Sequence, residues 1–381
     1  MKLSVFLCRL FLACLICSSS TSVAQIVGED VKVARDDLFL SQVRVEVLLR
    51  FRPVNFHGDN AAVTEFANAA SEDKIVYGGG TIIDKRWVLT SAHLFDKKVE
   101  SYEVEGEKVE FELTPRNVRV LAGEKDCTAQ VERSQVSHAV LHRSYDEKDP
   151  NTIKNDIAVL RLENELDLGN DKLEKLPLAQ YQPTHHMPMK CVISGWGRTD
   201  WGAGSDKLRW AQVWVVDPER TRFEYNDMTG LITVGKEWLT NNKRASASVG
   251  DSGGGLQCVD SGGDFQLFGV VQGGSTEANL AAGVKLGEPG IPTLVVSVFH
   301  HRDWINRQIG MRLPHANKGT TLFLNSDGNE ISLISPSRNN NKNNGKKRRF
   351  ENAGYGEYFE RSDMIVAVLV GGVLALIKLL I

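Results

Sequence analysis

The sequence predicts an all-β protein built as a double barrel. Two observations carry this prediction: many short β-rich segments alternate with Gly and Asn along the chain, and helical periodicity is rare. The length of 381 residues, with 42% hydrophobic residues and a formal net charge of −3, is ordinary for a globular protein. Because basic residues are not in excess, nothing points to nucleic acid as a partner.

The expected strands follow along the chain. Partial alternation of apolar and polar residues over 43–51 predicts a strand with one buried face. Further β-rich segments, each expected to form strands, are 78–94, 118–122, 157–160 and 208–216. Between them, we expect residues 53–74 to form an enlarged surface loop, and the charged residues 96–116 to form a solvated hairpin.

A serine lies among glycines in the segment Gly-Asp-Ser-Gly-Gly-Gly-Leu, residues 250–256. Glycine leaves the approach to Ser252 open and accepts positive φ, so the backbone N–H groups of Gly250 and Ser252 can form an oxyanion hole. A serine hydroxyl is a weak nucleophile unless a base takes its proton and a third group orients that base. His93 and Asp156, each beside a β-rich segment, are the candidates for these two roles.

Five segments, in this order, resemble motifs of the chymotrypsin/trypsin family of serine peptidases. They are Gly79-Gly80-Thr81-Ile82-Ile83, Thr90-Ser91-Ala92-His93, the Asp-Ile-Ala-Val-Leu-Arg-Leu of 156–162, Ser194-Gly195-Trp196-Gly197 and the Gly-Asp-Ser-Gly-Gly of 250–254. The resemblance covers about residues 26–312. It implies two six-stranded antiparallel β-barrels, a C-terminal helix at 298–312, and a serine endopeptidase that needs no metal or cofactor.

Both ends of the chain carry targeting signals. Residues 1–24 have the charged, apolar and small-residue regions of a secretory signal peptide, which predicts an extracellular protein. The apolar segment 364–381 follows a small-residue trio and a polar spacer, which matches a GPI-attachment signal, with a membrane-spanning helix as the alternative. Either would tether the protein to the cell membrane. We expect the polar residues 313–363 to form a disordered linker.

The resemblance also implies a disulfide between Cys191 and Cys258, which would leave Cys127 as a free thiol or as an intermolecular partner. It further implies an activation pair, in which the freed ammonium group of Ile26 enters a buried pocket and pairs with Asp251. Gln25 precedes Ile26, where the family has Arg or Lys, so activation by a trypsin-like enzyme is disfavoured.

Substrate preference in the resembling family depends on the residue six positions before the nucleophile, which here is Ser246. A neutral Ser246 at the base of the S1 pocket cannot pair with Lys or Arg, and Gly274 and Gly290 as pocket walls would leave room for a large apolar P1 side chain. Expected partners are therefore protein or peptide substrates, together with protease inhibitors.

Two other functions compete with the peptidase. A non-catalytic homologue acting as an adhesion or regulatory module is the main alternative, because Ser248 replaces a cysteine near the nucleophile and residues 271–274 depart from the family's Ser-Trp-Gly. A lipase or esterase is disfavoured because the order Ser, Asp, His along the chain is absent.

Overall fold

The computed structural model describes residues 27–28, 31–54, 61–129, 133–169, 171–186, 189–198, 205–220, 228–235, 245–273 and 292–331. The expected signal peptide, the C-terminal anchor and Ile26 lie outside the described residues. No helix in the described part of the chain is both long and apolar enough to cross a membrane.

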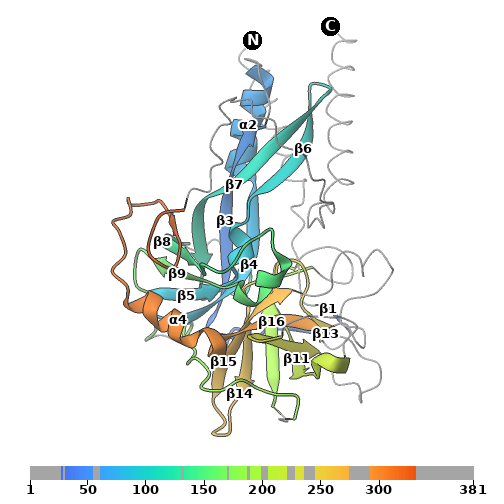
Figure 1. Ribbon diagram of the computed structural model, residues 1–381, viewed down its shortest axis with the longest axis vertical. Coiled ribbons are helices and arrows are strands. Elements are labelled where there is room, and N and C mark those ends of the chain that lie inside the picture. The colour runs from blue at the N-terminus through green and yellow to red at the C-terminus, as the bar shows by residue number, and fades with distance from the viewer. Residues whose placement is uncertain are drawn as a thin grey trace, which may run out of the picture.

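Six antiparallel strands close the first barrel (Figure 1). In ring order they are β8 (Ser134–Leu141), β9 (Ala158–Leu162), β5 (Trp87–Thr90), β4 (Ile75–Asp84), β3 (Gln42–Pro53) and β7 (Glu107–Leu121), with β7 pairing back onto β8. Alternate residues of β3, Val43, Val45 and Val47, are fully buried in the core of this barrel. The prediction of a strand with one buried face is wrong at the start of β3, because Arg44 and Glu46 on its other face are also buried.

The second barrel also closes through six antiparallel strands. In ring order they are β10 (Cys191–Gly195), β14 (Gly255–Val259), β15 (Phe265–Gly273), β16 (Thr293–Ser297), β12 (Leu231–Gly235) and β11 (Arg209–Val215), with β11 pairing back onto β10. Helix α4 (Val298–Gly310) follows and buries Trp304 and Ile305. The predicted fold of two six-stranded antiparallel barrels and a C-terminal helix is therefore confirmed.

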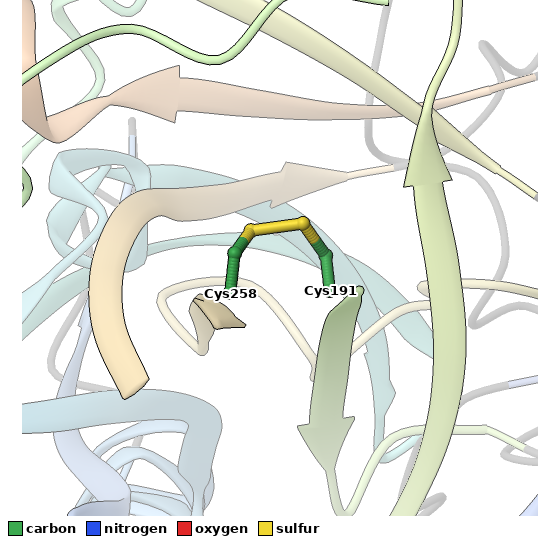
Figure 2. Close-up of a disulfide and its surroundings, with 2 residues drawn as sticks. All are labelled: Cys191 and Cys258. Atoms are coloured by element: carbon green, nitrogen blue, oxygen red, sulfur yellow. A yellow bond between two sulfur atoms is a disulfide. The ribbon is translucent and has the colours of Figure 1, made fainter. Parts of the chain in front are cut away.

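Several short elements lie outside the six-stranded ring of the second barrel. Strand β2 (Lys32–Val33) pairs with β11, β1 (Val27–Gly28) pairs with β13 (Ala245–Ser246), and η3 (Pro218–Arg220) is a single 3₁₀ turn. A disulfide joins Cys191 on β10 to Cys258 on β14, the pairing that the family resemblance implied (Figure 2). Cys127 is a buried free thiol, and burial raises its pKa.

The first barrel carries an additional helix and hairpin, which project from it together with the end of β3 (Figure 1). The predicted loop 53–74 is wrong in its second half, where α2 (Ala61–Asp73) forms. The predicted hairpin is present as β6 (Lys98–Val104) and β7. Its inner face is not solvated, because Phe111 is fully buried and packs with Phe66 of α2, Phe51 of β3 and Tyr102 of β6. This aromatic cluster gives α2 the apolar surface on which it folds.

The chain continues past α4 as an ordered segment, residues 311–331, which we call the C-terminal strap. A disordered linker from residue 313 was expected, so this part of the prediction is wrong. The strap includes β17 (Leu322–Leu324), which pairs in parallel with β8 of the first barrel. Beside β17, Thr321 Oγ donates to the carbonyl of Val136 at 2.7 Å, so polar side chains of the strap satisfy backbone groups of the barrel.

Candidate active site

The predicted catalytic residues come from both barrels. His93 lies in η1 (Ala92–Phe95), directly after β5, and Asp156 follows η2 (Pro150–Asn155), directly before β9. Ser252 precedes β14 of the second barrel. Two contacts join the barrels here: the Gly79 N–H donates to the carbonyl of Ser252 at 2.7 Å, and Ser91 Oγ donates to the carbonyl of Val271 at 3.2 Å.

His93 and Asp156 form a hydrogen-bonded pair. His93 Nδ1 lies 2.6 Å from Asp156 Oδ2, and the backbone N–H of His93 donates to Asp156 Oδ1 at 2.8 Å. Burial of the imidazole lowers its pKa, but the charge and the hydrogen bond of Asp156 outweigh burial, so the pKa of His93 is raised. A buried carboxylate bound to Nδ1 fixes the tautomer and leaves Nε2 as the base.

The Ser252 hydroxyl donates to the carbonyl of Gln272 on β15 at 3.2 Å, and it makes no hydrogen bond to His93. Ser252 Oγ must therefore turn away from Gln272 before His93 can take its proton. Such a contact commonly tightens only when substrate is bound. The role of Gln272 was not anticipated, because it depends on the pairing of β15 rather than on any sequence motif.

The backbone around Ser252 leaves two donors free. The N–H groups of Gly250 and Ser252 donate to no described residue, whereas those of Asp251 and Gly253 donate to Ser248 O and Val271 O. Gly250 has a φ of 94°, a conformation that favours glycine. Two unused N–H groups beside a nucleophile are what an oxyanion hole requires.

Gly253 shows why glycine follows the serine. Its φ is 87°, and a Cβ there would lie 2.2 Å from Thr90 Oγ1 and 2.3 Å from the carbonyl oxygen of Gly79. Any side chain would push the second barrel away from the strands that lead to His93. The close approach of the two barrels at Ser252 thus depends on this glycine.

Asp251 is fully buried, and no cation among the described residues pairs with it. Its carboxylate accepts from the N–H of Gly197 at 2.8 Å and from the N–H of Ser248 at 2.9 Å. Burial raises the pKa of Asp251 well above its ordinary value. Val27 of β1 pairs with Ser246 of β13, which precedes Asp251 by five residues in the sequence.

Only one of the three predicted S1 residues is described. Ser246 is fully buried, and its hydroxyl lies 2.9 Å from the hydroxyl of Thr293. Gly274 and Gly290 lie outside the described residues, so the walls of the pocket remain a prediction.

A second acidic side chain lies near the catalytic pair and was missed from the sequence. Asp96 Oδ2 accepts from Tyr145 Oη at 2.7 Å, and burial, as the largest cause, raises the pKa of Asp96 to about 7. The negative charge of Asp96 contributes to the raised pKa of His93. Its position three residues after His93 was the one available signal, but it was hidden in a charged segment.

Comparisons with known proteins agree with this geometry. The family model described as Trypsin matches residues 57–305. Kallikrein-8 of Rattus norvegicus is 30% identical over 236 residues, which cover 61% of this chain and 77% of that protein. Complement factor I of Mus musculus is 26% identical over 249 residues, which cover 62% of this chain and 35% of that protein.

Among solved structures, the fold is similar to that of neuropsin, described as a serine protease expressed in the limbic system of mouse brain. The TM-score is 0.52 at 22% sequence identity, and the match covers 74% of this chain and 99% of neuropsin.

Proposed function

Because this chain belongs to the trypsin family of serine proteases, we propose that it is an active endopeptidase with His93, Asp156 and Ser252 as its catalytic triad. The observation that carries the proposal is the 2.6 Å contact between His93 Nδ1 and Asp156 Oδ2, together with the N–H groups of Gly250 and Ser252 that donate to no described residue. A module retained only for adhesion would not need both features.

In this reaction, His93 Nε2 takes the proton of Ser252 as Oγ attacks the scissile carbonyl. Asp156 stabilises the imidazolium that forms, and the N–H groups of Gly250 and Ser252 bind the oxyanion. His93 then gives its proton to the leaving amine, and water, activated by the same histidine, releases the acyl group from Ser252. The raised pKa of His93 suits both directions of proton transfer near neutral pH.

We further propose that the ammonium group of Ile26 completes the buried Asp251 site, since a buried carboxylate without a cation is costly. A neutral Ser246 favours cleavage after large apolar P1 residues. This preference rests on the buried, hydroxyl-paired state of Ser246 and on the absence of an acid at that position.

The test is labelling of the full chain with a serine-directed fluorophosphonate, followed by hydrolysis of peptides with Phe, Leu or Arg at P1. The wild type should be labelled and should cleave after Phe or Leu faster than after Arg. Ser252→Ala should abolish labelling and lower kcat by about four to six orders of magnitude. The control Ser101→Ala, on the exposed face of β6, should behave as the wild type. If wild-type protein that begins at Ile26 is neither labelled nor active, the non-catalytic alternative holds.

A further inference from the structure

A groove of about 830 Å³ opens between the C-terminal strap and the first barrel. Its walls come from Ser137 and His138 in the middle of β8, from Arg161 of β9 and residues 163–164 after it, and from strap residues 312–318. None of the catalytic residues lines it. The strap residues that form one wall lie beyond the part of the chain that matches the trypsin family model, so this groove is an addition to the shared domain.

The walls of the groove are held in place by hydrogen bonds. His138 is 2% exposed, and its Nε2 lies 2.8 Å from the carbonyl oxygen of Pro314 in the strap. Ser137 Oγ donates to the carbonyl of Arg161 at 2.9 Å, which joins β8 to β9 beneath the groove. Glu163 accepts from the N–H of Gly319 and so ties the far end of the strap to the barrel.

Three permanent cations line the groove without a partner. Arg161, Arg312 and Lys318 make no ion pair or side-chain hydrogen bond with any residue in the described part of the chain. The lining contains one carboxylate, Glu163, and this carboxylate accepts the hydrogen bond from the strap backbone. The groove therefore has an excess of positive charge.

Arg161 is the least exposed of these cations. Its guanidinium is partly buried on β9, and burial, followed by repulsion from Arg86, lowers its pKa. Desolvating a cation without a counter-charge is unfavourable. An anion beside Arg161 would offset both the cost of burying its guanidinium and its repulsion from Arg86. Guanidinium groups offer several N–H donors in a plane, which match the oxygens of sulfate and phosphate groups.

We propose that this groove binds a tetrahedral oxyanion, a sulfate or phosphate group, held by Arg161 and Arg312 with Lys318 as a further cation. A dianion suits three cations set against one carboxylate. The volume lies within the range of small-molecule sites and leaves room beyond the anion itself, so the group can be free or can be the ester of a saccharide. This site would act independently of peptide hydrolysis.

Binding is tested on the full chain by titration calorimetry with three probes: inorganic sulfate, inorganic phosphate and a sulfated tetrasaccharide. Arg161→Gln and Arg312→Gln should each weaken binding about 10-fold or more, since a charge-assisted hydrogen bond is lost. The matched control is Lys108→Gln, which removes an exposed charge near the tip of the β6–β7 hairpin and should change binding less than about 2-fold.

Comparing the affinities of the three probes identifies the source of the bound anion. Tighter binding of the tetrasaccharide than of the inorganic ions identifies a glycan ester as the ligand, and equal binding identifies the free ion. Arg312 is exposed, so Arg312→Gln should keep the wild-type melting temperature and peptidase activity, which separates this site from the proposed function. The proposal is overturned if the wild type binds none of the three probes, if the control weakens binding as much as Arg312→Gln does, or if an acidic peptide binds more tightly than the sulfated probe.

Discussion

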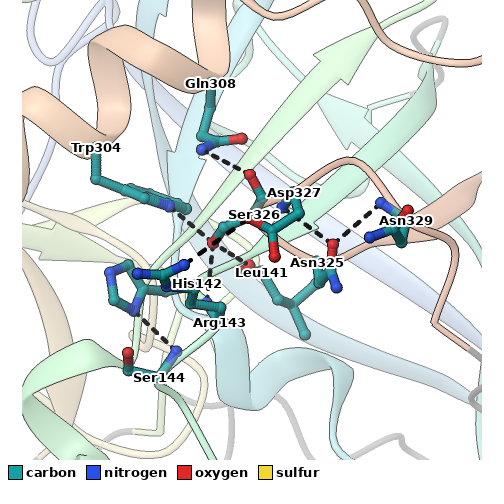
Figure 3. A network of polar contacts seen from close by, with 10 residues as sticks. All are labelled: Leu141, His142, Arg143, Ser144, Trp304, Gln308, Asn325, Ser326, Asp327 and Asn329. Carbon is teal, nitrogen blue, oxygen red and sulfur yellow. Dashed lines mark hydrogen bonds and ion pairs between the residues drawn. The ribbon is translucent and has the colours of Figure 1, made fainter.

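Replacing Ser326 by alanine should loosen the C-terminal strap from the protein, because one hydroxyl connects three elements (Figure 3). Ser326 Oγ accepts from the N–H of Arg143 and from Trp304 Nε1, both at 2.9 Å, and donates to the carbonyl of Leu141 at 3.2 Å. The residue is 8% exposed, so water reaches these groups poorly after the substitution.

The expected loss of stability follows from the number of hydrogen-bonding groups that Ser326→Ala leaves without a partner. Each buried donor or acceptor that loses its hydrogen bond costs about 1 to 3 kcal/mol. Two donors and one acceptor are affected, and the strap can relax to relieve part of the loss. We therefore expect Ser326→Ala to lower the free energy of unfolding by about 2 to 4 kcal/mol. At about 2 to 4 °C per kcal/mol for a domain of this size, the melting temperature should fall by about 4 to 16 °C.

Equilibrium unfolding in urea, monitored by tryptophan fluorescence, gives the free energy of unfolding. Calorimetry gives the melting temperature. Ser101→Ala is the matched control, since this serine is exposed on β6 and should change stability by less than about 0.5 kcal/mol. If Ser326→Ala costs no more than Ser101→Ala, the Ser326 hydroxyl contributes nothing to stability, and the contacts of Ser326 in Figure 3 do not hold the strap in place.

Two further predictions concern the catalytic site. Asp96→Asn should lower the pKa of His93, because the ionised Asp96 favours the imidazolium, and the effect should grow as pH rises through about 7, where Asp96 ionises. The acid limb of kcat/KM against pH should move to lower pH, with Asp96→Glu as the control that keeps the charge; a limb that stays in place would contradict this role. A mature chain that begins at Gln25 should be nearly inactive and one that begins at Ile26 active, because a buried ion pair that loses one partner costs about 3 to 5 kcal/mol. N-terminal sequencing of active protein checks this, and activity in a chain that starts at Gln25 would refute the pairing with Asp251.

Much of the site could be predicted from the sequence because its signals are local. The glycines around Ser252 form a local sequence motif, and Gly250 is needed for a positive φ within that motif. The contact that requires Gly253, by contrast, is made with Thr90 and Gly79 of the other barrel. Alternation over 43–51 marks a strand because successive side chains of a strand face opposite sides. The Cys191–Cys258 pairing required the family resemblance, since the three cysteines that follow the predicted signal peptide allow several pairings.

Other features were decided only by the tertiary structure. Helix α2 lies in a segment that is predicted as a loop because residues 53–74 are rich in Asn, Ala, Asp and Glu. The aromatic partners of its Phe66 lie on β3, β6 and β7. Residues 313–363 are predicted as a linker because the chain becomes polar, with an Asn-rich stretch at 339–344 and a basic cluster at 346–349. The strap is ordered by partners distant in sequence, and the acceptor of the Ser326 hydroxyl lies 185 residues away. The coupling of Asp96 to Tyr145 likewise spans 49 residues. The local sequence pattern determines which residues form strands and which side chains are candidates for catalysis. Burial, and hydrogen bonds between residues distant in sequence, form only when the chain has folded.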